Sequence, residues 1–307
     1  MSVGDVDGRV RTAAFDFLRA QTARHGEVLP FALLSQGFEL DGRRVPLLSM
    51  QGIFKPAVLP EMPLTIRTKA PVEGEDPPYD DAIGTDGLLR YRYRGTDSQH
   101  HDNVGLRLAM QRGVPLIYLF GITPGKYMPI WPVYIVGDHP AQLTFSVAVD
   151  AERAPAFGDP AVGLISREAR RAYVTVLTKQ RLHQQGFRER VLHAYRQQCA
   201  VCRLRHEELL QAAHILADGH PLGEPIVPNG LALCGLHHAA FDRHILGITP
   251  DHVIKIRRDI LRETDGPMLR HGLQEFEDRK ITPPRERASW PRPEFLAERF
   301  EQFLRAG

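Results

Sequence analysis

The chain has 307 residues, which is long for one domain and predicts two compact units of about 100 to 200 residues each. Its 43% hydrophobic and 25% charged residues are typical of a globular protein, and a net charge of +2 does not by itself indicate a nucleic-acid partner. No apolar run approaches the roughly 20 residues of a membrane span and no signal-peptide pattern opens the chain, so we expect a cytoplasmic protein without a membrane partner.

The first 150 residues predict a sheet with few helices. Residues 10–22 have helical spacing, whereas short apolar runs broken by Gly and Pro follow from about residue 28 onward, among them VPLIYLFGI and LTFSVAV. Only DNVGLRLAMQRG, at residues 102–113, interrupts these runs with a helical pattern. Residues 1–150 are therefore expected to form a curved sheet or small β-barrel with one inserted helix.

A basic strand face is predicted within LLRYRYRG. Alternation along a strand sends its three arginines to one face and Leu89, Tyr91 and Tyr93 to the other. The arginines are Arg90, Arg92 and Arg94. Such a face suits contact with a nucleic-acid backbone, and the alternative is the solvated face of an ordinary half-buried strand.

Residues 151–186 are expected to form a linker and a basic helical segment. Residues 151–163 are rich in Ala, Pro and Gly, which suits a linker. Residues 166–198 then have a helical pattern, with a possible break at Gly186, and carry far more Lys and Arg than Glu. Basic side chains release counterions from phosphates, so the segment suits DNA contact, and a solvated helix face is the alternative.

Three cysteines and a histidine have the spacing of metal ligands. Cys199 and Cys202 are separated by two residues, and so are Cys234 and His237. Three clustered cysteines are too few for a disulfide framework, and in a reducing compartment this pattern favours a metal. Two such pairs match a closed, tetrahedral zinc site, and the alternative is buried free thiols beside an unrelated histidine.

A further histidine, His238, follows the predicted zinc ligand and must point elsewhere, because adjacent residues face different directions. Together with His214 in "AAHI" and Asn229 in "NGLALCGLHHAAFD", it forms a pattern that resembles the HNH nucleases. The resemblance covers about residues 187–257, where the cysteine pairs interleave with all three positions. It implies a ββα-metal fold with a structural zinc.

The resemblance also implies a role for each of these residues. His214 would be the general base, since a neutral imidazole can take a proton from water near pH 7. Asn229 would orient that imidazole and brace the loop, and His238 would bind a divalent ion, Mg²⁺ or Mn²⁺, at the scissile phosphate. Asp242 lies on the same helix face as His238 and is a candidate second ligand, or else a structural cap. Many relatives have an acidic ligand before the base, where this chain has Ala213.

Residues 91–137, from YRYRG to VYIVG, resemble the SRA domains and their PUA-like barrel class in their strand ends, an "N..LR" helix and a closing Y and V segment. This resemblance implies a reader that flips a modified base into an aromatic-lined pocket. The candidate pocket residues are Tyr93, Asp97, Tyr118, Tyr127 and Trp131. Core packing is the alternative for such large aromatic side chains.

The whole sequence predicts an α+β protein with a DNA reader at residues 1–150, a zinc-containing HNH domain at 187–257 and a C-terminal extension at 258–307. This layout resembles the McrA-like, modification-dependent (type IV) restriction enzymes. The resemblance implies an endonuclease that hydrolyses double-stranded DNA near a modified nucleotide, with modified cytosine favoured. Since cutting both strands usually requires two sites, a homodimer is expected.

Several alternatives stay open at this point. The mark could be 5-methylcytosine, 5-hydroxymethylcytosine, another base modification or a phosphorothioate. An HNH homing or repair nuclease would cut without modification dependence. A non-catalytic zinc DNA-binding protein would have no need of a positioned base.

Overall fold

The chain divides into two compact units, Met1–Leu182 and His183–Gly307. We describe a computed structural model that covers residues 3–70, 88–149, 167–264 and 266–306. The predicted linker at residues 151–163 lies outside the described residues. In the parts that are described, no helix is long and apolar enough to cross a membrane.

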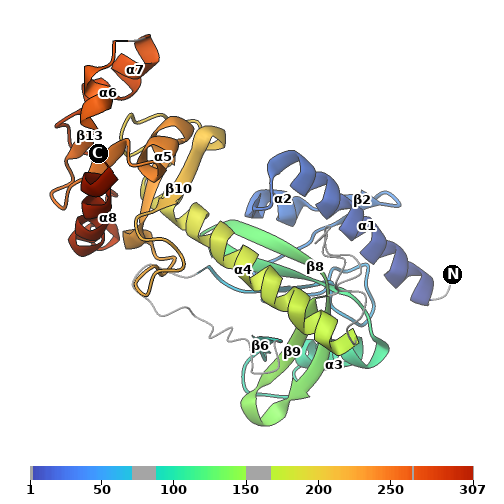
Figure 1. Cartoon of the computed structure of the whole chain (residues 1–307). Coiled ribbons are helices and arrows are strands. Elements are labelled where there is room, and N and C mark those ends of the chain that lie inside the picture. Colours follow the sequence, from blue (N-terminus) through green and yellow to red (C-terminus); the bar gives the residue numbers. More distant parts are fainter. Residues whose placement is uncertain (1–2, 71–87, 150–166, 265, 307) are drawn as a thin grey trace. The chain divides into compact units, whose positions relative to one another are not determined.

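The first unit is built on one curved, seven-stranded sheet (Figure 1). Its strands lie in the order β4 (Ile53–Phe54), β5 (Thr65–Arg67), β7 (Leu116–Thr123), β8 (Lys126–His139), β9 (Thr144–Val149) and β6 (Leu89–Arg92), and β1 (Leu29–Pro30) pairs with β8. All these pairs are antiparallel except β5–β7. The other elements are α1 (Val3–His25), α2 (Phe31–Gln36), the hairpin β2 (Phe38–Leu40) and β3 (Arg43–Val45), α3 (His101–Arg112) and η1 (Pro140–Gln142).

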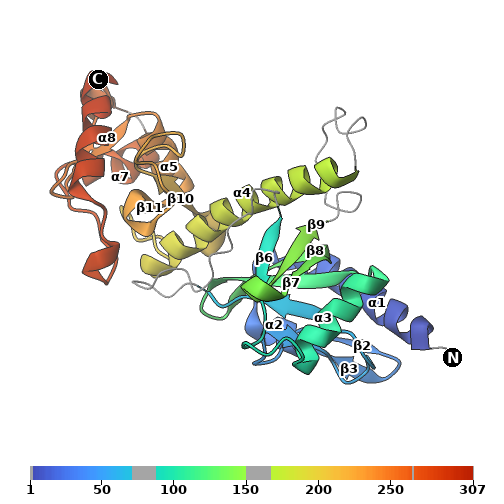
Figure 2. The same ribbon diagram turned by 90° about the horizontal axis from the view of Figure 1, so that it is seen from below.

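Each face of this sheet has its own core, because successive side chains along a strand point to opposite faces. One apolar cluster joins the sheet to α3 and includes Leu106, Tyr118 and Phe145. The other joins the opposite face to α1 and includes Leu18 and Leu119. The two helices can be followed on either side of the sheet in Figure 2.

The curvature brings the two edge strands of the sheet together. The hydroxyl of Tyr91, on edge strand β6, lies 3.1 Å from the carbonyl oxygen of Gly52, just before the other edge strand, and 3.3 Å from that of Arg67 on β5. Tyr91 is buried on the same side of the sheet as Leu106 of α3. The expected curved sheet is therefore confirmed as a half-barrel, and α3 is the helix expected at residues 102–113. The expectation of a single inserted helix was wrong, because the short helix α2 also lies among these strands.

The second unit contains an antiparallel hairpin followed by a short helix. The hairpin joins β10 (Leu210–His214) to β11 (Gly230–Cys234), and α5 (Gly235–Asp242) packs against both strands (Figure 1). The helix before it, α4 (Arg167–Ala194), continues through Gly186, so the possible break there does not occur. The remaining elements are η3 (Glu207–Leu209), η4 (Val227–Asn229), β12 (Leu246–Ile248), β13 (Ile254–Ile256), α6 (Arg258–Arg262), α7 (Pro267–Gly272), η5 (Gln274–Phe276), η6 (Arg287–Ser289) and α8 (Pro293–Ala306).

The last turns of α4 pack closely on this hairpin at the point where His214 pairs with Gly230. A Cβ atom on Gly230 would lie 2.4 Å from Cγ2 of Val191 and 2.9 Å from Cζ of Phe187. Both of these neighbours are buried in the core of the second unit. Only glycine therefore lets the helix lie this close to the strand.

We expect Gly230→Ala to destabilise the second unit by about 1–3 kcal/mol, because the added methyl group overpacks a rigid core. Urea denaturation followed by circular dichroism measures the change. Gly219→Ala is the matched control, since a Cβ atom there meets nothing within 4 Å. Equal stability of the two variants would show that α4 does not pack this tightly.

Candidate active site and metal centre

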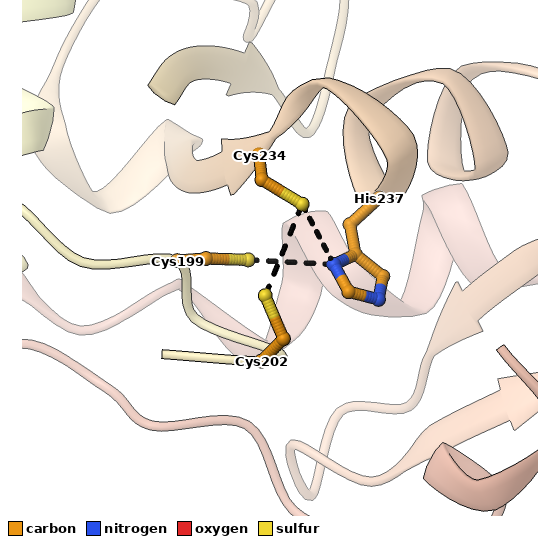
Figure 3. A group of neighbouring side chains, drawn as sticks. All are labelled: Cys199, Cys202, Cys234 and His237. Carbon is orange, nitrogen blue, oxygen red and sulfur yellow. Dashed lines mark hydrogen bonds between the residues drawn. The ribbon is translucent and has the colours of Figure 1, made fainter. Parts of the chain in front are cut away.

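Four sulfur and nitrogen atoms converge in the second unit (Figure 3). Cys199 and Cys202 lie in the turn after α4, Cys234 ends β11, and His237 lies in the first turn of α5. Their ligand atoms all lie within 4.8 Å of one another. A compact group of three sulfurs and one imidazole nitrogen could hold a tetrahedral metal ion, and this donor set suits zinc.

The imidazole of His237 is oriented by a second contact. Its Nδ1 lies 3.1 Å from Sγ of Cys234 and 3.5 Å from Sγ of Cys199. Its Nε2 donates to the carbonyl oxygen of Gly272, on α7, at 2.9 Å. Such an outer hydrogen bond fixes the tautomer whose other nitrogen is free to bind a metal. Hydrogen bonds from the neighbouring thiols lower the pKa of Cys234, which favours the thiolate that metals require.

Backbone hydrogen bonds shape the turn that carries the first two cysteines. The amide of Cys199 donates to Leu204 at 2.9 Å, and the amide of Arg203 donates back to Cys199 at 2.9 Å. Arg203 adopts a left-handed conformation with φ of 62° to close the turn. The amide of Ala200 donates to Ala232 on β11 at 2.7 Å, so the turn is fixed against the strand that ends in the third cysteine.

His214 lies at the end of β10, half-buried, with one ring face covered. Its imidazole stacks on Phe187 with ring centroids 4.0 Å apart and planes 15° apart. Its Nε2 is buried and has no hydrogen-bond partner within the described structure. Burial lowers the pKa of His214, and the nearby charge of His238 lowers it further, while Asp218 and Asp242 oppose the shift. The imidazole is therefore neutral near pH 7, as a general base must be.

Asn229 is fully buried and holds the loop that joins the two strands of the hairpin. Its Nδ2 donates to the carbonyl oxygens of Leu216 and Glu224 at 3.0 and 3.1 Å, and its Oδ1 accepts from the amide of Leu216 at 2.9 Å. Its backbone carbonyl accepts from the amide of Ile215 at 2.9 Å. Asn229 thus fixes the backbone directly after His214, and Phe187 makes the contact with the ring.

His238 and Asp242 lie one turn apart on α5. Nε2 of His238 is 3.3 Å from Oδ2 of Asp242, and its Nδ1 is hydrogen-bonded to the side-chain oxygen of Gln211 on β10. Because Gln211 holds the Nδ1 proton, Nε2 presents its lone pair next to the carboxylate. An imidazole nitrogen and a carboxylate oxygen in this arrangement could hold a divalent ion. Ala213 has only a methyl side chain and is fully buried, and since a methyl group has no donor atom, the side chain before His214 contributes no ligand.

The hairpin, the short helix and the cysteine and histidine cluster lie in a segment that matches a known protein family. Residues 199–249 match the HNH endonuclease family. The chain carries an HNH endonuclease domain. The match includes both halves of the cysteine and histidine cluster, and the domain is that of an enzyme that hydrolyses phosphodiester bonds in DNA.

Other comparisons add little to the HNH match. No curated protein matches the chain. Among solved structures, the chain is similar to a "Modification dependent TagI restriction endonuclease", with 16% sequence identity over 79% of this chain and 82% of that chain and a TM-score of 0.30. At this TM-score the likeness carries no weight for the fold or the function of this chain.

Three side chains of the second unit that contact the candidate site were missed by sequence reasoning: Gln211, Phe187 and Arg299. Gln211 contacts His238, Phe187 stacks on His214, and Arg299 of α8 lies near Asp242. Each acts across a distance in sequence that no local spacing reveals. A polar residue at an exposed strand position three residues before His214 was the one available signal for Gln211.

In the first unit, the alternation predicted for β6 is present. Leu89, Tyr91 and Tyr93 are buried, whereas Arg92 and Arg94 are exposed. Arg90 donates to Oγ of Ser146 at 2.6 Å, and Arg94 pairs with Asp102 at the start of α3. His139 also lies 2.7 Å from Oγ of Ser146, so the outer face of β6, β9 and β8 carries basic and polar groups together.

The predicted pocket residues do not come together in one cage. Tyr93 and Tyr118 belong to the cluster under α3, whereas Tyr127 and Trp131 pack on the opposite face of the sheet. Asp97 is exposed and accepts a hydrogen bond from the amide of Gln99 at 2.8 Å.

Tyr93 contacts both an aromatic ring and charged side chains. Its ring stacks on Phe145, and its hydroxyl donates to Asp138, which also accepts from Arg107 at 2.7 Å. Burial raises the pKa of Tyr93, and the hydrogen bond to Asp138 adds to this rise, so the phenol stays protonated.

Removal of metal from the Cys199, Cys202, Cys234 and His237 cluster is expected to unfold the HNH domain, because a structural site of this kind contributes folding free energy directly. Strong chelators applied to the whole chain, followed by metal analysis and circular dichroism, measure the effect. Ser substituted for Cys202 should reproduce it. A metal-free protein with an unchanged unfolding transition would contradict this role.

Proposed function

We propose that the chain is a modification-dependent DNA endonuclease, which hydrolyses phosphodiester bonds near a modified nucleotide. The observation that carries the catalytic part is the meeting of a neutral imidazole, His214, with the His238 and Asp242 pair at the HNH hairpin. Gln211, on the same strand as His214, contacts His238, so the strand that carries the imidazole lies against the helix that carries His238 and Asp242.

The residues divide the reaction between them. The imidazole of His214 takes a proton from water, the water oxygen bonds to phosphorus, and the bond from phosphorus to the 3′ oxygen breaks, with a proton returned to that oxygen. His238 and Asp242 would hold Mg²⁺ or Mn²⁺. When bound, that ion stabilises negative charge on the phosphate and the leaving oxygen. We assign Zn²⁺ to the four-ligand cluster, where it does no chemistry.

Target selection is assigned to the first unit. An HNH domain contacts mainly the backbone, and backbone contacts carry no sequence information. The first unit has cores of its own, and one face of β6 carries the half-buried Arg90 and the exposed Arg92. The resemblance of residues 91–137 to SRA domains favours a modified base, and modified cytosine above other marks. Tyr93, Asp138 and Arg107 form one hydrogen-bonded network in this unit, and we propose that this network takes part in reading the base edge.

Double-stranded DNA is the substrate that fits a protein in which one unit selects the target and the HNH domain cuts it. Each chain carries one HNH domain, and two strands must be cut. We therefore propose that the protein acts as a homodimer, with one active site for each strand.

His214→Ala should abolish DNA cleavage, with a loss of about 100-fold to 10,000-fold. Since the pKa of His214 is lowered below 6.5, the base form persists on acidification, and the acidic limb of kcat/KM should lie below pH 6.5. Plasmid cleavage with Mg²⁺ or Mn²⁺ measures both effects. His193→Ala on α4 is the control, because His193 is exposed and should leave the rate unchanged. Near wild-type cleavage by the His214→Ala protein would contradict the assigned role.

The full-length His214→Ala protein should bind duplex DNA that carries its mark more tightly than unmarked duplex. Arg92→Ala should weaken binding to both the marked and the unmarked duplex, and should reduce the salt dependence of binding by about one phosphate contact. The ratio of the two affinities should change little. Replacing Tyr93 should reduce the ratio of the affinity for marked duplex to the affinity for unmarked duplex. Titrations with 5-methylcytosine, 5-hydroxymethylcytosine and phosphorothioate duplexes measure these constants.

Arg44→Ala is the matched control for Arg92, since Arg44 lies on the β3 hairpin and bonds to the backbone of Gln36. It should leave both the affinity and the ratio unchanged. Equal affinity for every marked and unmarked duplex would remove modification dependence and leave a nuclease of the homing or repair kind.

A further inference from the structure

The C-terminal helix α8 is fixed against the HNH domain. Phe303 of α8 packs so closely on β12 that a Cβ atom on Gly247 would lie 2.6 Å from its ring. Earlier in the same helix, Glu298 pairs with His220, in the loop between β10 and β11, at 2.8 Å. A helix held at both points presents its intervening side chains to the domain in a fixed geometry.

Arg299 of α8 reaches the last turn of α5. Its Nη2 donates to the carbonyl oxygen of Phe241 at 3.0 Å, and its guanidinium carbon lies 4.8 Å from the centroid of the Phe241 ring. The carbonyl groups at a helix C-terminus lack partners within the helix, so a cationic donor there stabilises the last turn. Arg299 is largely buried and its Nε has no hydrogen-bond partner in the described structure, so its position is set by packing on Phe241.

That last turn carries Asp242. Its Oδ1 is 4.0 Å from Nη2 of Arg299, and its Oδ2 is 3.3 Å from Nε2 of His238. The carboxylate therefore lies between a fixed cation and the imidazole. With α5 only eight residues long and the side chain of Asp242 54% exposed, little else orients this carboxylate along the helix itself.

We infer that Arg299 is a positioning residue of the nuclease site, which holds the last turn of α5 so that Asp242 and His238 face one divalent ion. This inference rests on the proposed function of that pair. The fork of a guanidinium matters here, because one group must donate to Phe241, stack on its ring and face the carboxylate. A positive charge alone would instead oppose the binding of a cation.

The opposed effects of charge and position define the test. Arg299→Lys keeps the charge and removes the planar fork, whereas Arg299→Met keeps the apolar stem and removes the charge. Arg305→Met is the control on the same helix, since Arg305 is exposed and pairs with Glu301 at 3.1 Å. Binding of Mn²⁺ to the zinc-loaded full chain, without DNA, is measured by calorimetry, together with zinc content and helix content.

We expect Arg299→Lys to weaken Mn²⁺ binding by about 10-fold to 100-fold, the effect typical of a lost outer contact to a metal ligand. The Mn²⁺ concentration for half-maximal cleavage should rise in parallel, with zinc content unchanged and Arg305→Met equal to wild type. Wild-type affinity in Arg299→Lys with tighter binding in Arg299→Met would overturn the inference, because Arg299 would then act as a charge only.

Loss of zinc in both Arg299 variants would also overturn it, since Arg299 would then be needed for the fold of the domain. A different result would contradict the proposed function. If wild-type protein and Arg305→Met cleave no DNA, the nuclease proposal falls, and the Mn²⁺ titration still decides the role of Arg299.

Discussion

The convergence of three cysteines and one histidine is the constraint on which the proposed nuclease site depends. It connects the turn after α4, the end of β11 and the first turn of α5, and His237 extends the connection to Gly272 on α7. An isolated helix as short as α5 would not be stable in water, so its direction is set by this cluster and by packing of its apolar face. Because His238 follows His237 directly, a contact that fixes the side chain of His237 also fixes the backbone position from which the imidazole of His238 extends.

The site is thus assembled by contacts between segments that are far apart in the sequence. The strand of the hairpin supplies His214 and Gln211, α4 supplies the ring under His214, and α8 closes the far end of α5 through Arg299. The C-terminal extension predicted at residues 258–307 lies in the same compact unit as the HNH residues. Its helix buries Phe295 and Leu296 in the core that also contains β10 and β11.

The parts of this account that the sequence predicted are those with fixed local spacing. Metal ligands require two short pairs, and strand alternation separates Leu89 from Arg90, so both features could be inferred without a structure. The face on which an aromatic residue lies was harder to infer, because Tyr118 and Tyr127 lie on neighbouring strands whose register shifts twice. The predicted break at Gly186 failed for another reason: packing of a long helix outweighs the propensity of one glycine.

The central claim is that the cluster builds the active site although it does no chemistry itself. The direct measurement is the rate of DNA cleavage at saturating Mg²⁺ or Mn²⁺ against the zinc content of the same protein, as zinc is returned to the metal-free chain. The account predicts that cleavage rises in proportion to bound zinc and reaches its plateau at one zinc ion per chain, with helix content rising in step. Full cleavage by protein that holds almost no zinc would contradict it.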